Sequence, residues 1–183
     1  MVLLVPVLFI PLLGYAVAAT RVAETDPSHG PPPFRPSARL LSDGLWTSLA
    51  VFLVALPFAL GLNPLASALR ALGEPAAHVV AFFALALPWG LVSLLLLPHC
   101  TAGFAASGNP RDMFNVAAAL RGVRRDFMTW NVAAAAIVTG WAIGLACAGA
   151  VCVGIVPGVF YAILVSAHAT ATLHPQGAGL PPR

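Results

Sequence analysis

Charged residues are scarce in this chain, and lysine is absent. Asp, Glu, Lys and Arg together make up 8% of its 183 residues, and all nine basic residues are arginine. A soluble globular domain is about 25% charged and about 45–50% apolar, whereas this chain is 60% apolar with a mean hydropathy of +0.91. One domain of this length cannot bury so much apolar surface in its own core. The composition excludes an ordinary soluble domain and predicts a protein surrounded by lipid.

The apolar runs also lack carboxylates. The six acidic residues lie in polar segments or at the edges of apolar ones: Glu24, Asp26, Asp43, Glu74, Asp112 and Asp126. Ionisable groups at mid-membrane depth are the usual signature of proton relays and ion sites. Their absence argues against a proton-coupled transporter or pump. It leaves open a passive route lined by backbone and hydroxyl groups.

Motifs that carry chemistry are missing too. The sequence has no G-x-x-x-x-G-K phosphate loop, no recognisable Ser/His/Asp arrangement and no C-x-x-C pair. The histidines are scattered and no acidic residue follows Asp126, so we predict no catalytic residue, no metal site and no cofactor. Cys147 and Cys152 would form a disulfide only if the chain turned between them, and as small apolar residues they fit membrane helices without one.

About five apolar runs are long enough, at 1.5 Å per helical residue, to cross a hydrocarbon core of about 30 Å. They cover residues 1–19, 45–62, 76–97, 127–147 and 151–173. The last two come from one uncharged stretch that we expect to turn near Gly149. The predicted fold class is all-α: a polytopic transmembrane helical bundle with short interfacial amphipathic helices. It forms a single domain over residues 1–176, followed by a disordered tail at 177–183.

The first apolar run has an alternative explanation as a cleaved signal peptide, because Ala16-Val17-Ala18 resembles a signal-peptidase site. However, no Lys or Arg precedes the run, and a signal peptide needs a positively charged start. Pro6 and Pro11 also interrupt it. We therefore expect a retained span.

We predict a short helix on the membrane surface in each of two segments between spans. Residues 64–72 follow a good N-cap, Asn63, and end at Gly73. Asn109 and Pro110 begin a second helix, along which apolar residues recur at helical spacing. Its far end carries Arg121, Arg124 and Arg125. Each arginine would contribute roughly 1 kcal/mol near anionic lipid, and setting the topology is the alternative explanation.

Local signals also mark the start of the second span. Ser37 is placed to cap a helix that begins at Ala38. Arg39 and Asp43 lie four residues apart on one helix face, so we expect an ion pair between them. Asp43 is the best single candidate for a functional residue, although this pairing would explain it as well.

The arginines are distributed unevenly over the loops. With five spans, only Arg70 lies on one side of the membrane and the other eight lie opposite. The positive-inside rule then predicts an outside N-terminus and a cytoplasmic C-terminus in a multi-pass plasma-membrane protein. The arginines form no basic stripe, which argues against nucleic acid as a partner. The use of arginine alone is typical of G+C-rich codon usage and favours a prokaryotic source.

Small residues recur at helix-packing spacing in the last two spans. Gly140 and Gly144 form one G-x-x-x-G pair, and Gly154 and Gly158 form another. Such faces let two helices approach closely. Packing within one molecule explains them, and association into a homo-oligomer or with another membrane protein is the alternative.

Several short motifs together suggest a family. In chain order they are Gly14-Tyr15, Pro32-Pro33-Phe34, the Arg39–Leu45 segment Arg-Leu-Leu-Ser-Asp-Gly-Leu, Pro98, Phe104, Phe114 and Pro157-Gly158-Val159-Phe160-Tyr161. Over residues 4–176 this order resembles the uncharacterised prokaryotic membrane proteins grouped as domain of unknown function (DUF) 4013. The resemblance implies a multi-span membrane protein and no site residues. Members usually have more residues before the glycine–tyrosine pair, so a misassigned or truncated start at Met1 is one interpretation.

Two functional hypotheses remain. The first is a non-enzymatic helical-bundle component that associates with itself or a partner, or lets a small solute pass. The alternative is a lipid-modifying membrane enzyme with a cytoplasmic interfacial site. The enzyme hypothesis depends on whether four polar residues converge on one pocket: His99, Asp112, Asp43 and His168.

Overall fold

The structure is a computed structural model that describes residues 4–26, 30–150 and 155–173. All regular secondary structure in these ranges is helical, so the all-α prediction is confirmed for them. The elements are α1 (Leu4–Thr25), α2 (Ala38–Ala68), the 3₁₀ helix η1 (Arg70–Leu72), α3 (Glu74–Ser107), the 3₁₀ helix η2 (Pro110–Phe114), α4 (Val116–Arg125), α5 (Phe127–Ala150) and α6 (Ile155–Ala171). The predicted tail, Cys152 and Gly154 lie outside the described residues.

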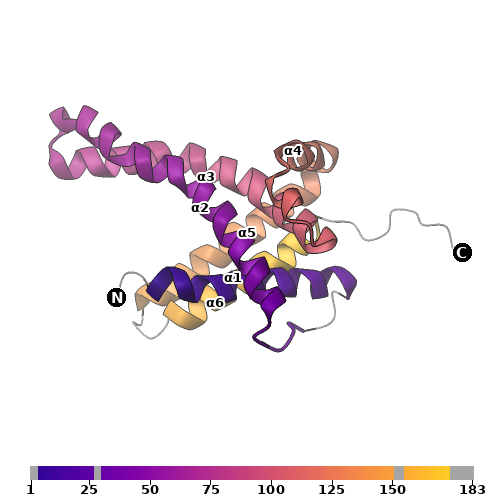
Figure 1. The fold of residues 1–183 in the computed structure, drawn as a ribbon. Helices are drawn as coiled ribbons and strands as arrows, with labels where there is room; N and C mark the ends of the chain where they lie inside the picture. Colours follow the sequence, from indigo (N-terminus) through magenta and orange to yellow (C-terminus); the bar gives the residue numbers. More distant parts are fainter. Residues whose placement is uncertain (1–3, 27–29, 151–154, 174–183) are drawn as a thin grey trace, which may run out of the picture.

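The helices form two groups that meet at one end of the molecule (Figure 1). α1, α5 and α6 pack together as a layer, and α2 and α3 form a long hairpin that crosses it. The tip of the hairpin, at η1, stands clear of the layer, and α4 lies beside the end of α3. At one end of the molecule α1, α3 and α6 end, and α2 and α5 begin. We call this end the charged end. Most of the described charged residues lie there, whereas Arg70 and Glu74 lie at the hairpin tip.

Three predicted boundaries differ from the structure. Asn63 and Pro64 do not start a new helix, because α2 continues through both to Ala68. A helix with few protein neighbours in an apolar setting keeps its backbone groups bonded by continuing, which outweighs the proline. The second predicted surface helix is broken at Asn115, whose side chain accepts a hydrogen bond from the amide of Ala118 and caps α4. The predicted turn near Gly149 is also wrong, since α5 continues to Ala150.

The start of α2 is as predicted. Its first residue is Ala38, and the hydroxyl of Ser37 accepts a hydrogen bond from the amide of Leu40 at 3.2 Å. This bond satisfies one of the amides that a helix start leaves without a partner.

Glycines set how closely α1 and α2 cross. A Cβ at Gly14 would overlap the carbonyl oxygen of Leu40, and one at Gly44 would overlap that of Ile10. The two backbones are therefore in direct contact, and no larger residue fits at either position without moving a helix. This contact brings the end of α1 over the first turns of α2.

Within the described residues, three helical segments are long and apolar enough to cross a membrane: α2, α3 and Phe127–Gly144 of α5. Gly158–Ala171 of α6 is a shorter apolar helix. On the hairpin, Phe52, Leu60, Phe83 and Leu87 are 55–67% exposed. Soluble monomers rarely expose so many neighbouring large apolar side chains. The fold is therefore that expected of a membrane protein.

Candidate functional site

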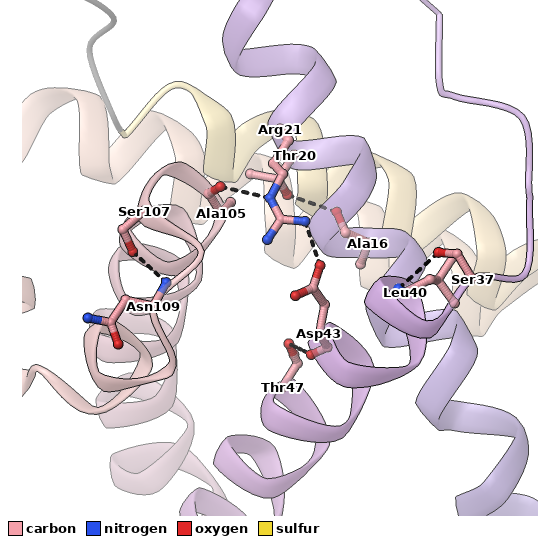
Figure 2. Close-up of polar contacts among 10 residues, drawn as sticks. All are labelled: Ala16, Thr20, Arg21, Ser37, Leu40, Asp43, Thr47, Ala105, Ser107 and Asn109. Carbon is pink, nitrogen blue, oxygen red and sulfur yellow. Dashed lines mark hydrogen bonds and ion pairs between the residues drawn. The ribbon is translucent and has the colours of Figure 1, made fainter.

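An ion pair at the charged end joins three helices (Figure 2). Arg21, near the end of α1, places Nη1 2.5 Å from Oδ2 of Asp43 on α2. Its Nε donates a hydrogen bond of 2.8 Å to the carbonyl of Ala105 on α3. The guanidinium carbon also lies 5.9 Å from the ring centroid of Phe104. We call this arrangement the clasp.

The predicted pair between Arg39 and Asp43 is wrong, because Asp43 pairs with Arg21 instead. The close crossing at Gly14 and Gly44 brings Arg21 over Asp43 and buries their contact. Arg39 is exposed and lies towards Gly108, at the end of α3. Sequence spacing favours partners on one helix, whereas here the crossing of two helices decides the partner.

Two polar atoms beside the pair are buried and have no hydrogen-bond partner within the described residues: Nη2 of Arg21 and Oε1 of Glu24. Glu24 lies in the last turn of α1, past its apolar part. Desolvation by burial raises the pKa of this carboxyl to about 7, and the positive charge of Arg21 opposes the rise. Glu24 therefore titrates near neutral pH, unlike an exposed carboxylate.

A polar cavity of about 1090 Å³ lies at the charged end, on the side of α3 that faces α4. Polar side chains from several helices and from the junctions between them line it: His99, Ser107, Asp112, Asn115, Arg125, Asp126, Thr129 and Thr172. A Cβ at Gly122 would come within 2.8 Å of the His99 ring, so this glycine lets α4 lie against the ring.

Asp126 has a structural role at the wall of this cavity. Its Oδ1 accepts a hydrogen bond from the Thr129 amide at 3.0 Å, and its Oδ2 accepts one from the Thr129 hydroxyl at 2.6 Å. The hydroxyl bond, followed by the amide bond, lowers the pKa of Asp126. Asp126 thus caps α5 and stays ionised at neutral pH.

A second, apolar cavity of about 720 Å³ lies between the hairpin and the layer of α1, α5 and α6. We call it the lateral groove. No charged side chain of the described residues lines it. Towards the charged end it carries a hydroxyl from each of four helices: Thr20, Thr47, Thr101 and Thr170. The Thr20 and Thr47 hydroxyls donate to carbonyls one turn earlier, which leaves their oxygens able to accept.

The four polar residues of the enzyme hypothesis do not converge on one pocket. His99 and Asp112 line the polar cavity. Asp43 belongs to the clasp, and His168 lines a separate apolar cavity of about 530 Å³ between α1, α5 and α6. Within the described residues, no three His, Cys, Asp or Glu side chains are grouped as a metal site requires.

The arginines near the end of α4 are all exposed. Arg125 lines the polar cavity. Arg121 donates a hydrogen bond of 3.2 Å to the carbonyl of Ala117 on its own helix. Sequence reasoning named these residues but missed Arg21 and the four threonines. The only sequence signal for the threonines is their position inside or beside apolar runs.

The glycines of the last two spans lie between α5 and α6. A Cβ at Gly144 would come within 2.5 Å of the Gly158 carbonyl oxygen, and the reverse contact is as short. A Cβ at Gly140 would lie 2.9 Å from Val165. The described part of this glycine face is thus covered within the molecule.

Comparison with known families shows a match over most of the chain. A family model described as "Protein of unknown function (DUF4013)" matches residues 1–166. The chain belongs to the DUF4013 family. This confirms the resemblance seen in the sequence motifs. No curated protein and no solved structure matches the chain.

Several DUF4013-like motifs meet in space although they lie far apart in sequence. The Tyr15 hydroxyl donates a hydrogen bond of 2.8 Å to the carbonyl of Pro32. The Tyr15 ring stacks on Phe160 with centroids 5.7 Å apart and lies tilted against Phe34 at 5.8 Å. Gly14 is the close-crossing residue of α1. In this protein, these motif residues hold α1, the following loop and α6 together.

Proposed function

We propose that this protein is a multi-pass membrane component without a catalytic role, and that it holds a bilayer lipid in its lateral groove. The carrying observation is the composition of the groove wall, which is mostly apolar, with Ser93 and Ser166 along its length and four threonines towards the charged end. A lipid matches this arrangement, because its apolar acyl chains are joined at one end to ester oxygens. Passive passage of a small solute along the same groove is the other non-enzymatic use of this space.

The position of the groove supports lipid as the occupant. Its α3 wall includes Leu87 and Leu91, which are 66% and 64% exposed, so the wall continues into the outer surface of the hairpin. That surface belongs to two of the helices suited to cross a membrane. A lipid chain can enter sideways from the bilayer, and a carbonyl oxygen can lie beside the hydroxyl of Thr101, which is half-buried whereas the other three threonines of the groove are buried.

Gly90 offers a direct test of the groove. It lines the groove, and a Cβ there would meet nothing within 4 Å. Gly90→Leu therefore fills the groove without moving a helix. Ala84→Leu is the matched control, since Ala84 is exposed on the same helix and lies outside the groove.

Native mass spectrometry of the protein, extracted in mild detergent, measures bound lipid. We expect equal numbers of bound lipids on the wild type and on the Ala84→Leu control, and one bound lipid fewer on Gly90→Leu. Equal retention by all three proteins, or a wild type that carries no lipid, would contradict the proposal.

We further propose that α1, α2, α3, α5 and α6 each span the membrane, with the N-terminus outside and the C-terminus in the cytoplasm. The arginine distribution supports this topology. In a chain without native cysteines, Pro33→Cys and Ala71→Cys place single thiols in the first and second connections. An impermeant maleimide applied to intact cells should label only the cysteine at position 71. Labelling at position 33 would contradict the orientation.

Contact of Arg121, Arg124 and Arg125 with anionic lipid belongs to the same proposal. Their exposure at one end of α4 supports it. The covered glycine face favours packing within one molecule over a homo-oligomer formed through Gly140, Gly144 and Gly158. A partner protein would instead bind the exposed side of the hairpin formed by α2 and α3.

The lipid-modifying enzyme remains the second candidate because His99 and Asp112 line one polar cavity. Turnover of phospholipid by the purified protein, lost in His99→Gln, would favour it over the non-enzymatic proposal.

A further inference from the structure

The polar cavity carries charges of both signs. Asp112 and Asp126 bring two carboxylates to its wall, and Arg125 brings one guanidinium. A purely anionic ligand would face two like charges, and a purely cationic one would leave Arg125 without a counter-charge. The wall therefore suits a ligand that bears both a negative and a positive group.

Two of these charges are available to a ligand. The side chains of Asp112 and Arg125 form no ion pair with each other and no hydrogen bond or ion pair with other side chains of the described residues. Asp112 is half-buried and Arg125 is exposed, so the carboxylate lies deeper than the guanidinium. Asp126 is already held by Thr129.

Small residues in the wall of the polar cavity leave space for a ligand. Gly103 and Ala106 on α3 and Ala118 and Gly122 on α4 are among the residues that line the cavity, which has a volume of about 1090 Å³. The cavity lies at the charged end, where the apolar parts of α3 and α5 stop. Lipid headgroups lie at this level of a membrane protein.

We infer that this cavity binds the phosphoethanolamine group of an amine-bearing phospholipid, with the ammonium at Asp112 and the phosphate at Arg125. An ammonium donates three hydrogen bonds to a carboxylate and to neighbouring oxygens, whereas the trimethylated ammonium of choline donates none. Arginine pairs with phosphate through two parallel N–H bonds. The site is separate from the lateral groove and does not depend on the groove being occupied.

Lipid competition tests the inference. The protein is placed in detergent with equal amounts of phosphatidylethanolamine and phosphatidylcholine, and native mass spectrometry measures the ratio of the two bound lipids. A second arm adds soluble phosphoethanolamine, which shows whether the headgroup alone competes or the membrane lipid is needed. We expect an ethanolamine preference that Asp112→Asn lowers about tenfold, since a charged hydrogen bond is lost.

Variants separate the two contacts. Arg125→Gln should weaken binding of both lipids, because both carry phosphate. Arg111→Gln is its control, because Arg111 in η2 is exposed and does not line the cavity. Glu74→Gln, at the hairpin tip, is the control for Asp112→Asn. The Gly90→Leu variant should keep the ethanolamine preference, which distinguishes this site from the groove. No preference in the wild type, or one unchanged by Asp112→Asn, would overturn the inference.

Discussion

Replacing Asp43 by Asn should destabilise the protein through the clasp. The substitution keeps the shape of the side chain but removes the charge that compensates Arg21. The two side chains are only 20% and 10% exposed, and removing one partner of a buried pair costs about 3–5 kcal/mol. Because Arg21 keeps some contact with solvent and its bond to Ala105, we expect a loss of about 3 kcal/mol, at the lower end of that range.

Thermal unfolding of the detergent-solubilised protein measures this loss. For a chain of this size, about 3 kcal/mol corresponds to a fall in Tm of roughly 6–12 °C. The pair between Arg70 and Glu74 provides the control, because its atoms are 3.9 Å apart and its side chains are 70% and 73% exposed. Glu74→Gln should therefore cost about 0.5 kcal/mol or less.

A double variant separates the charge from the packing. Arg21→Met with Asp43→Leu replaces the ion pair by apolar side chains of similar size, and such exchanges often restore stability. We expect a Tm within a few degrees of the wild type, well above that of Asp43→Asn. The reasoning fails if Asp43→Asn and Glu74→Gln have the same Tm, because the clasp would then contribute no more than a surface pair.

Three further predictions concern packing and protonation. Gly144→Leu should strongly lower thermal stability without changing the mass in detergent, because its Cβ would meet the Gly158 carbonyl at 2.5 Å; a change of mass alone would point to an oligomer interface. Tyr15→Phe should cost about 1 kcal/mol, measured by unfolding, for the lost bond to Pro32, and an unchanged Tm would show that the ring contacts suffice. The folded-state pKa of Glu24 is raised from 4.5 to about 7, so the protonated form is favoured on folding. Its contribution to stability is complete below pH 4.5 and lost as pH rises through about 7, and Glu24→Gln should flatten this part of the Tm profile.

Features that depend on neighbouring residues along the chain were predictable. Ser37 caps α2 because a hydroxyl before a helix bonds to an amide three residues later. The family was recognised from short motifs that the family match confirms. Predictions of helix ends were wrong where the surroundings outweighed a local signal. Asn63 and Pro64 resemble a helix start, yet α2 continues through them.

Features that depend on which helices cross were not predictable. Arg39 was the expected partner of Asp43 because it lies one turn away, but the contact of Gly14 with α2 brings Arg21 closer. His99 and Asp112 share a cavity while His168 lies in another. Spacing along a helix says which face a residue occupies, but not which other helix covers that face.

By itself, the sequence predicted a helical protein with a composition suited to lipid, and the described residues are helical with long apolar helices. The apolar fraction and the low number of charged residues are properties of the composition, so they are the same for any arrangement of the helices. Only the tertiary structure decided the partner of Asp43, the cover over Gly144 and the cavity shared by Asp112 and Arg125. Each of these depends on where two helices cross, and a crossing is set by the contacts of many side chains at once.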